Sequence, residues 1–256
     1  MIPDPADNIW EHSQNVRGLY RRRAEGEGEM DAAAQCAEIL TPFIRRGAAP
    51  PSLMGADIAA PFIRQYAAPP RLLDAGCGSG YLWHSFKKRG LAVEYFGLDY
   101  SPSLIDIGRE VLPRHGLEAE RLTCGAIEDV CGQSYDIAVL LNTLTFCPDY
   151  REPLDRLMET GAKILIIRDN FGPETLRRWE IDGYLDPGYN HLKAYWNQWQ
   201  TDEVVAFIAA SGYQVTPIPD RRTGGRMEPV VDKPYYWSWL LAVKPVLPQE
   251  PASRSK

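Results

Sequence analysis

The stretch LLDAGCGSG, residues 72–80, decides how the chain folds. Its apolar beginning is typical of a buried strand, and Gly76, Gly78 and Gly80 follow where such a strand turns into a helix. Glycine lets the backbone approach a ligand closely, because it has no Cβ. In an open parallel sheet, this turn lies at the carboxyl ends of the strands, where ligands bind. The stretch therefore predicts a ligand site at the end of the first strand of an α/β sheet.

A second acidic signal follows at the end of the next apolar run. Asp99 comes about 20 residues after Gly80, which is the offset at which a carboxylate accepts hydrogen bonds from a ribose. The nearest rival, a nicotinamide-dinucleotide site, has the spacing Gly-x-Gly-x-x-Gly, whereas the third glycine comes one residue earlier here. Asp74 would also repel a pyrophosphate and attract an ammonium group. The pattern favours S-adenosylmethionine, which combines an adenosine with a positively charged amino-acid arm.

Short apolar runs alternate with amphipathic stretches from residue 71 onward, as in parallel sheets with crossover helices. Strands are predicted over 71–75, 93–98, 121–124, 135–141, 163–168, 213–218 and 236–243, and helices over 81–89, 103–112, 150–160 and 202–210. Ser101 is expected to cap the second of these helices, with Pro102 at its first position. The predicted fold is α/β: a doubly wound, mostly parallel seven-stranded sheet with helices on both faces and an antiparallel C-terminal strand.

The chain divides into five predicted parts. Residues 1–66 form a helical lead-in with a helix over 30–43, and residues 67–168 form the cofactor-binding core. Residues 169–200 interrupt the sheet pattern with seven aromatic side chains, which predicts a cap over the acceptor site. Residues 201–244 complete the α/β core, with a mobile loop around 221–225, and 245–256 form a disordered tail.

Residues 71 to about 168 resemble the core of class I S-adenosylmethionine-dependent methyltransferases. Within them the chain is similar to the small-molecule branch that includes ubiquinone-biosynthesis O-methyltransferases and the Nod-factor N-methyltransferase. The resemblance implies that the loop surrounds the methionine moiety, that Asp99 binds the ribose hydroxyls, and that Tyr100 and Ser101 flank the adenine. The expected residues around the methionine moiety are Asp74, Gly76, Cys77, Gly78 and Gly80.

Two further segments of this resemblance are expected at the cofactor. The family often has Gly-Asp-Ala after the third strand, but this chain has Gly125-Ala126, so the Ile127 N–H and the Glu128 carboxylate are expected to contact the adenine. Leu141 and Asn142 end the fourth predicted strand, where they would pack under the cofactor. Asn142 is polar at the end of a buried strand and is therefore also a catalytic candidate facing the acceptor.

Methyl transfer needs alignment of a nucleophile with the methyl group and, for a hydroxyl, removal of a proton. His191 is the candidate base, because it lies within the predicted aromatic cap, whereas the three other histidines are expected to be structural or exposed. The candidate acceptor-binding residues are Tyr20, Tyr184, Tyr189 and Trp196. Arg21–23, Arg221 and Arg222 could bind a phosphate or carboxylate on the acceptor, although consecutive arginines are more often solvated.

Composition limits the range of partners. The net charge of −6 argues against a polyanion, and the five scattered cysteines include no pair with zinc-ligand spacing, so no metal site is predicted. No apolar run is long enough to span a bilayer, and the first residues lack a secretory signal, which predicts a cytoplasmic protein. The predicted partner is a small-molecule acceptor methylated on O or N, with no nucleic acid and no membrane.

Two alternatives remain open at this point. One is a protein or nucleic-acid methyltransferase, against which the absence of an Asn/Asp-Pro-Pro-Tyr signature counts. The other is a catalytically idle S-adenosylmethionine-binding regulatory module, which would keep the same glycine loop and Asp99.

Overall fold

The fold is described from a computed structural model of the 256-residue chain. The structure describes residues 17–18, 20–21, 24–25, 51–130, 132–181, 193–230 and 233–245. The predicted helix over 30–43, the candidates Tyr184, Tyr189 and His191, and the predicted tail beyond residue 245 lie outside the described residues. In the part of the chain that is described, no helix is both long and apolar enough to cross a membrane.

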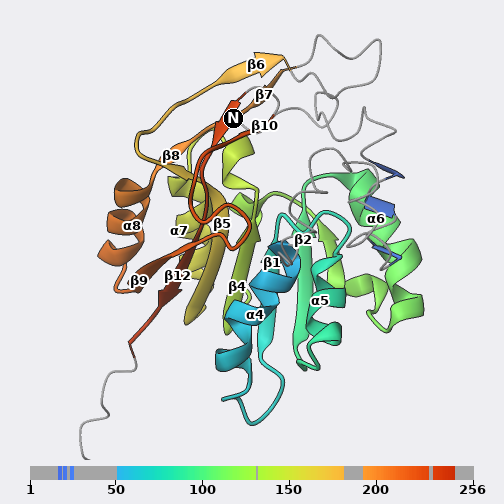
Figure 1. The fold of residues 1–256 in the computed structure, drawn as a ribbon. Helices are drawn as coiled ribbons and strands as arrows, with labels where there is room; N and C mark the ends of the chain where they lie inside the picture. The colour runs from blue at the N-terminus through green and yellow to red at the C-terminus, as the bar shows by residue number, and fades with distance from the viewer. Residues whose placement is uncertain are drawn as a thin grey trace, which may run out of the picture.

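A mostly parallel sheet forms the centre of the molecule (Figure 1). Its strands are β1 (Arg71–Ala75), β2 (Glu94–Asp99), β3 (Leu122–Cys124), β4 (Ile137–Leu141), β5 (Ile164–Gly172), β8 (Trp199–Gln200), β9 (Gln214–Pro219) and β12 (Trp237–Val243). They follow the order β3-β2-β1-β4-β5-β12-β9, and β8 pairs with the end of β5. The first five are parallel to one another, whereas β12 runs antiparallel between β5 and β9. The predicted fold class is confirmed, and the crevice for a ligand lies where the strand order reverses, between β1 and β4.

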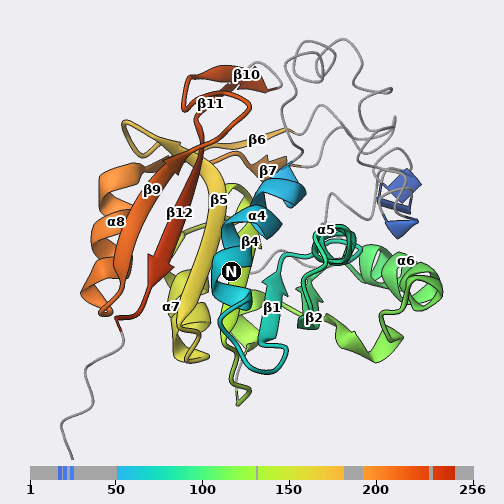
Figure 2. The ribbon, with the colours of Figure 1, turned by 60° about the horizontal axis from the view of Figure 1, so that its bottom comes forward.

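Helices cover both faces of this sheet, as Figures 1 and 2 show. They are α4 (Pro51–Ile63), α5 (Leu82–Lys88), α6 (Pro102–Val111), α7 (Arg151–Glu159) and α8 (Thr201–Ala210), with the 3-10 helices η3 (Leu112–His115), η4 (Ala119–Arg121), η5 (Ile127–Asp129) and η6 (Leu144–Phe146). Successive strand residues point to opposite faces. Leu72 therefore packs with α4, α5 and α6, whereas Leu73 packs with α7 and α8.

Strand β5 continues to Gly172, past its predicted end at residue 168. Its extension carries the fully buried Asp169 and Asn170, and Phe171 pairs with Trp199 of β8. Both ends of the predicted cap segment 169–200 therefore belong to the main sheet. Between them, β6 (Trp179–Ile181) and β7 (Lys193–Tyr195) form a two-stranded antiparallel ribbon.

A second small ribbon follows the turns at 221–225. Its strands are β10 (Glu228–Val230) and β11 (Lys233–Tyr235), which pair antiparallel and lead directly into β12. The sequence predicts a mobile loop around 221–225 and neither of these strands. The ribbon brings Tyr235 and Trp237 to the end of β5, beside the crevice.

Candidate functional site

The glycine loop joins β1 to α5 with a backbone that only glycine adopts easily. Gly76, Gly78 and Gly80 all have positive φ, at 71°, 58° and 75°. A Cβ on Gly76 would lie 2.9 Å from Thr143 Cγ2 and closer still to the Thr143 hydroxyl. The loop thus lies directly against the segment that follows β4, and a side chain would fill the space between them. This cradle fits the cofactor predicted from the sequence.

Two other predicted loop residues serve packing as well. Cys77 is buried, and its side chain lies in the core cluster under α4 and α5. A Cβ on Gly80 would meet Leu112 at 2.9 Å and Leu122 at 3.0 Å, so this glycine lets the loop pack on η3 and β3. Their backbones remain in the predicted cofactor loop, but neither position opens a side chain toward a ligand.

Asp99 ties the end of β2 to the glycine loop. Its carboxylate accepts hydrogen bonds from the backbone N–H of Gly78 at 2.7 Å and of Ser101 at 2.9 Å. The Ser101 side chain in turn accepts from the backbone N–H of Leu104 at 3.4 Å, which confirms it as the cap of α6. The neighbouring Tyr100 is half-buried. The predicted ribose and adenine residues therefore form one hydrogen-bonded corner beside the loop, while their contacts with the cofactor stay predictions.

Asp74 lies at the end of β1, directly before the loop, and its carboxyl group is buried. The hydroxyl of Tyr95, on β2, donates a hydrogen bond to Asp74 Oδ2. Burial, together with the nearby charge of Asp99, raises the pKa of Asp74 to about 7, against the opposing effect of the Tyr95 hydrogen bond. The sequence predicts the acid at this place but not its tyrosine partner.

The segment after β3 forms the short helix η5. Ile127 is buried and Glu128 is half-buried at the start of this helix. The Asp129 carboxylate accepts a hydrogen bond from the backbone N–H of Ala126 at 3.3 Å. The contact of Ile127 and Glu128 with the adenine stays a prediction.

Asn142 follows Leu141, which is buried at the end of β4, and has a φ of 56°. Among the described residues it is the only non-glycine residue with positive φ, a conformation that concentrates at functional sites. The Arg168 guanidinium donates a hydrogen bond to Asn142 Oδ1, and the backbone N–H of Asn142 donates to the Arg168 carbonyl at 2.7 Å. Because a guanidinium only donates, the atom that faces it must be the amide oxygen. The amide nitrogen of Asn142 is then the group left to meet a ligand.

Arg168 belongs to a buried ion pair that the sequence analysis misses. Its Nε lies 2.8 Å from Asp220 Oδ2, and both side chains are at most 3% exposed. The same oxygen accepts a hydrogen bond from the Trp239 indole at 3.1 Å, and the guanidinium stacks 4.1 Å from the centre of the Trp237 ring. A charged residue at the carboxyl end of an otherwise apolar strand was the signal that could have revealed it.

Hydrogen bonds to backbone groups join the extension of β5 to the loop after β4. Asp169 accepts from the backbone N–H groups of Leu144 and Thr145 at 2.7 and 3.0 Å, and from the Thr145 hydroxyl at 2.6 Å. Asn197 donates through its side chain to the Cys147 carbonyl at 2.7 Å, and the Trp199 indole donates to the Leu144 carbonyl at 3.0 Å.

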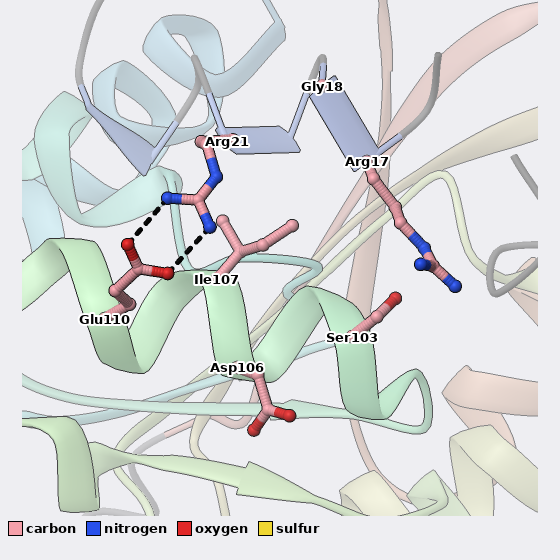
Figure 3. Close-up of a pocket in the computed structure, with 7 residues that line it drawn as sticks. All are labelled: Arg17, Gly18, Arg21, Ser103, Asp106, Ile107 and Glu110. Carbon is pink, nitrogen blue, oxygen red and sulfur yellow. Dashed lines mark hydrogen bonds and ion pairs between the residues drawn. The ribbon is translucent and has the colours of Figure 1, made fainter. Parts of the chain in front are cut away.

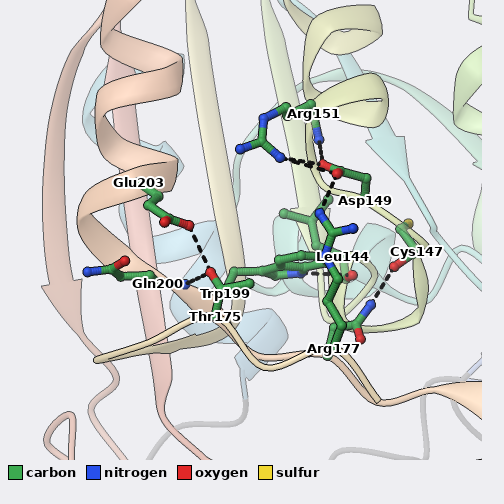
Figure 4. A network of polar contacts seen from close by, with 10 residues as sticks. Leu144, Cys147, Asp149, Arg151, Thr175, Arg177, Trp199, Gln200 and Glu203 are labelled. Carbon is green, nitrogen blue, oxygen red and sulfur yellow. Dashed lines mark hydrogen bonds and ion pairs between the residues drawn. The ribbon is translucent and has the colours of Figure 1, made fainter. Parts of the chain in front are cut away.

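Charged and polar side chains in exposed positions continue this junction, and Figure 4 draws their contacts. Arg177 pairs with Asp149 at 2.7 Å, and Thr175 connects the backbone of Gln200 with Glu203 of α8. The first and last residues of the predicted cap segment are thus bound firmly to the core.

Trp196 lies in a small aromatic cluster beside this junction. We define the aromatic cluster as Phe146, Trp196, Tyr235 and Trp237. The ring centres of Phe146 and Trp196 are 5.4 Å apart, those of Trp196 and Tyr235 are 6.5 Å apart, and those of Tyr235 and Trp237 are 4.7 Å apart. Through Trp237 the cluster reaches Arg168, and through Arg168 it reaches Asn142. Trp196 is thus connected to Asn142 at the end of β4 through Tyr235, Trp237 and Arg168, and its predicted contact with an acceptor stays a prediction.

Tyr20 lies elsewhere, against the glycine loop. A Cβ on Gly78 would lie 2.8 Å from Tyr20 Cδ1 and closer still to Cε1, and the Ser79 hydroxyl donates to the Tyr20 carbonyl at 2.9 Å. The next residue, Arg21, pairs through both guanidinium nitrogens with Glu110 of α6 at 2.7 and 2.8 Å. The structure therefore does not bring Tyr20 together with Trp196, because this pairing holds the N-terminal segment on the cofactor side.

A hollow of about 460 Å³ lies between this segment and the outer face of α6 (Figure 3). It is lined by Arg17, Gly18, Arg21, Ser103, Asp106, Ile107 and Glu110. These residues are not those at the end of β4 or in the aromatic cluster.

Two of the other arginines considered as anion ligands, Arg221 and Arg222, lie in the described residues and are also paired with carboxylates. Arg221 lies 3.1 Å from Asp57 Oδ2, and Arg222 forms an ion pair with Glu228. Their charges are balanced within the chain, which gives no support to a dedicated phosphate site there.

Comparison with known proteins agrees with this interpretation of the site. Residues 73–162 match the family described as "Methyltransferase domain". No curated protein matches the chain. The structure is similar to magnesium protoporphyrin IX methyltransferase from Synechocystis PCC 6803 with bound SAH, at 18% identity and a TM-score of 0.58, covering 94% of this chain and 100% of that one.

Two further solved structures share the fold over about three quarters of the chain. One is a glycopeptide N-methyltransferase complexed with sinefungin, at 15% identity and a TM-score of 0.54, covering 76% of this chain and 94% of that one. The other is an amino pentose methyltransferase from Micromonospora echinaspora, at 16% identity and a TM-score of 0.50, covering 75% and 90%. The family match over residues 73–162 therefore identifies the central part of this chain as a methyltransferase domain, and the glycine loop and Asp99 lie within the matched residues.

Proposed function

We propose that the protein transfers the methyl group of S-adenosylmethionine to an oxygen or nitrogen atom of a small, ring-bearing acceptor. The observation that carries this proposal is the continuity between the aromatic cluster, Arg168 and Asn142 at the end of β4. Small-molecule sites combine mostly apolar surfaces with a few placed polar groups, and the aromatic cluster and Asn142 together provide both kinds of group. The solved structures with this fold include a magnesium protoporphyrin IX methyltransferase, a glycopeptide N-methyltransferase and an amino pentose methyltransferase.

Different residues would bind the cofactor and the acceptor. When bound, the cofactor supplies a methyl group that its sulfonium already activates. The glycine loop and Asp99 would hold the cofactor, while the aromatic cluster would orient the acceptor by stacking. Asn142 would donate a hydrogen bond from Nδ2, because Arg168 occupies its oxygen. We therefore assign Asn142 an aligning role and not that of a base.

His191 is the proposed base for a hydroxyl acceptor, on its position in the sequence alone. If it removes the acceptor's proton, His191→Asn should lower turnover by ~10²–10⁴-fold with little change in cofactor affinity. A larger effect on the KM for the acceptor than on kcat would contradict that role. Free thiols at Cys77, Cys124 and Cys147 support the proposal that the enzyme works in the reducing cytoplasm.

The test is a screen with methyl-labelled S-adenosylmethionine against separate pools of porphyrins, glycosylated metabolites, amino sugars, protein and RNA. We expect label in one of the small-molecule pools, and none with the Gly78→Val variant as control. Label confined to protein or RNA would refute the small acceptor. Tight cofactor binding with no transfer to any pool would instead favour the catalytically idle module.

A further inference from the structure

Tyr95 places a hydroxyl group deep in the core, among apolar side chains. The residue is 1% exposed and lies between the sheet and α5, with the Trp83 ring 6.0 Å away. Burying a hydroxyl is unfavourable unless it makes a hydrogen bond. Tyr95 makes that bond with Asp74 Oδ2. The hydroxyl therefore has one evident purpose in this structure, which is to bind the Asp74 carboxyl group.

Asp74 has a second oxygen that this bond does not use. Among the described residues, Asp74 Oδ1 has no hydrogen-bond partner, although Asp74 is 3% exposed. The residue directly precedes the glycine loop, so its carboxyl group lies where the amino-acid arm of the cofactor is expected. A buried carboxylate with one oxygen held and the other unpaired suits an ammonium group, which would supply both the charge and the hydrogen bond.

We propose that Tyr95 is a positioning residue for the amino-acid arm of the cofactor, because it holds Asp74 with one oxygen turned toward the ammonium group. The proposal rests on the assignment of the cofactor site and adds a residue to it. Tyr95 is not expected to touch the cofactor. It acts through Asp74, by fixing the direction of the carboxyl group and by favouring its charged form.

The surroundings of Asp74 give the proposal a pH signature. The groups that act on this carboxyl are Tyr95 and Asp99 from β2, and the Cys77 thiol lies close by in the loop. Burial and Asp99 favour the neutral acid, whereas the Tyr95 hydrogen bond favours the carboxylate. Only the carboxylate attracts an ammonium, so affinity for the amino-acid arm should rise as the pH increases through about 7.

The experiment compares two probes by titration calorimetry between pH 5.5 and 8.5. S-adenosylhomocysteine carries the amino-acid arm, and methylthioadenosine lacks it. In the wild-type protein, affinity for S-adenosylhomocysteine should increase with pH while affinity for methylthioadenosine stays constant. With Tyr95→Phe, binding of S-adenosylhomocysteine at pH 7 should weaken by about 10- to 100-fold, the range for one hydrogen bond to a charged group. Its pH midpoint should move upward, and binding of methylthioadenosine should not change.

Tyr213→Phe is the matched control, because Tyr213 is also buried and its hydroxyl donates to the Ala162 carbonyl at 2.6 Å. Ala162 lies just before the amino-terminal end of β5, whereas the glycine loop lies at the carboxyl ends of the strands. This variant should bind both probes as the wild type does. Asp74→Asn keeps Tyr95 and removes the charge, so it should abolish the pH dependence.

Three outcomes would overturn the proposal: an unchanged affinity of Tyr95→Phe for S-adenosylhomocysteine, an equal loss for both probes, or a flat pH profile in the wild type. If the wild type bound neither probe, the cofactor assignment itself would fail instead.

Discussion

Replacing Asp220 by asparagine should destabilise the protein strongly, because it leaves the buried charge of Arg168 without its partner. The two side chains are 2% and 3% exposed, and Arg168 Nε lies 2.8 Å from Asp220 Oδ2. Both carboxylate oxygens accept hydrogen bonds, Oδ2 also from the Trp239 indole and Oδ1 from the backbone N–H of Arg222 at 2.9 Å. An asparagine of the same size would turn its NH₂ group toward one of these donors.

Breaking a buried ion pair on one side costs about 3–5 kcal/mol in free energy of unfolding. For a chain of this length, the same loss corresponds to a decrease in Tm of ~6–20 °C. Although burial raises the pKa of Asp220, the attraction of Arg168 lowers it below its usual value overall. The contribution of the pair is therefore present above the pKa of an unfolded aspartate and is lost as the pH falls through the folded value.

Urea unfolding followed by tryptophan fluorescence measures this effect, since Trp237 and Trp239 adjoin the pair. Asp57→Asn is the control, because Asp57 pairs with Arg89 and Arg221 at the surface, where about 1 kcal/mol or less is expected. If Asp220→Asn lost no more free energy of unfolding than Asp57→Asn, the assigned role of the buried pair would be wrong.

Three further predictions concern the cofactor side. Gly78→Val should abolish binding of S-adenosylhomocysteine while circular dichroism shows a folded protein, because φ is 58° there and the Tyr20 ring fills the space that a Cβ would need; normal binding by a folded variant would contradict the loop assignment. Asp99→Ala should weaken both S-adenosylmethionine and S-adenosylhomocysteine by about 10- to 100-fold in calorimetry, since the carboxylate also holds the backbone N–H of Gly78. Because the raised pKa of Asp74 makes the folded protein bind a proton more tightly than the unfolded chain, cofactor-free protein should lose stability as the pH rises from about 4 through 7, and Asp74→Asn should flatten that dependence in denaturation curves at pH 5 and 8.

The parallel half of the fold could be predicted because its signals are local. Each strand is an apolar run bounded by turn residues, and the glycine loop fixes which strand comes first in the βα pattern. The predicted and observed ends of β1 coincide, and α6 begins at Pro102 behind the predicted cap Ser101. No such signal marks β6, β7, β10 and β11, because these three-residue strands are too short for an alternating pattern and, unlike the equally short β3, lie outside the regular alternation of strands and helices.

The end of β5 shows a different limit. Asp169 and Asn170 have the composition of a turn, yet both are fully buried in the strand. Their polar groups are satisfied by the backbone of segments distant in sequence, at Leu144 and Thr145 for Asp169 and at Tyr236 for Asn170. A sequence pattern cannot reveal partners that only the tertiary fold brings together.

The same limit applies to the site. The glycine loop, Asp74 and Asp99 can be predicted from their spacing in the sequence. The roles of Tyr95, Arg168 and Asp220 follow only from their contacts in the fold. Tyr20 is a further case, because its place against the glycine loop depends on the Arg21–Glu110 pair, which its sequence neighbours do not reveal, and its contact with an acceptor stays a prediction.

The junction between β5 and the loop after β4 bears on how this enzyme could change its acceptor over evolution. Asp169 and Asn197 hold that junction mainly through backbone groups of Leu144, Thr145 and Cys147, which persist whatever side chains those positions carry. The ribbon beyond it exposes Trp179 and Ile181 to solvent, with 48% and 53% of their surface accessible. Substitutions there would leave the junction, and with it the cofactor loop, intact. If this ribbon borders the acceptor, as the sequence predicts, such substitutions would change which molecule is methylated without altering the site proposed for the methyl donor.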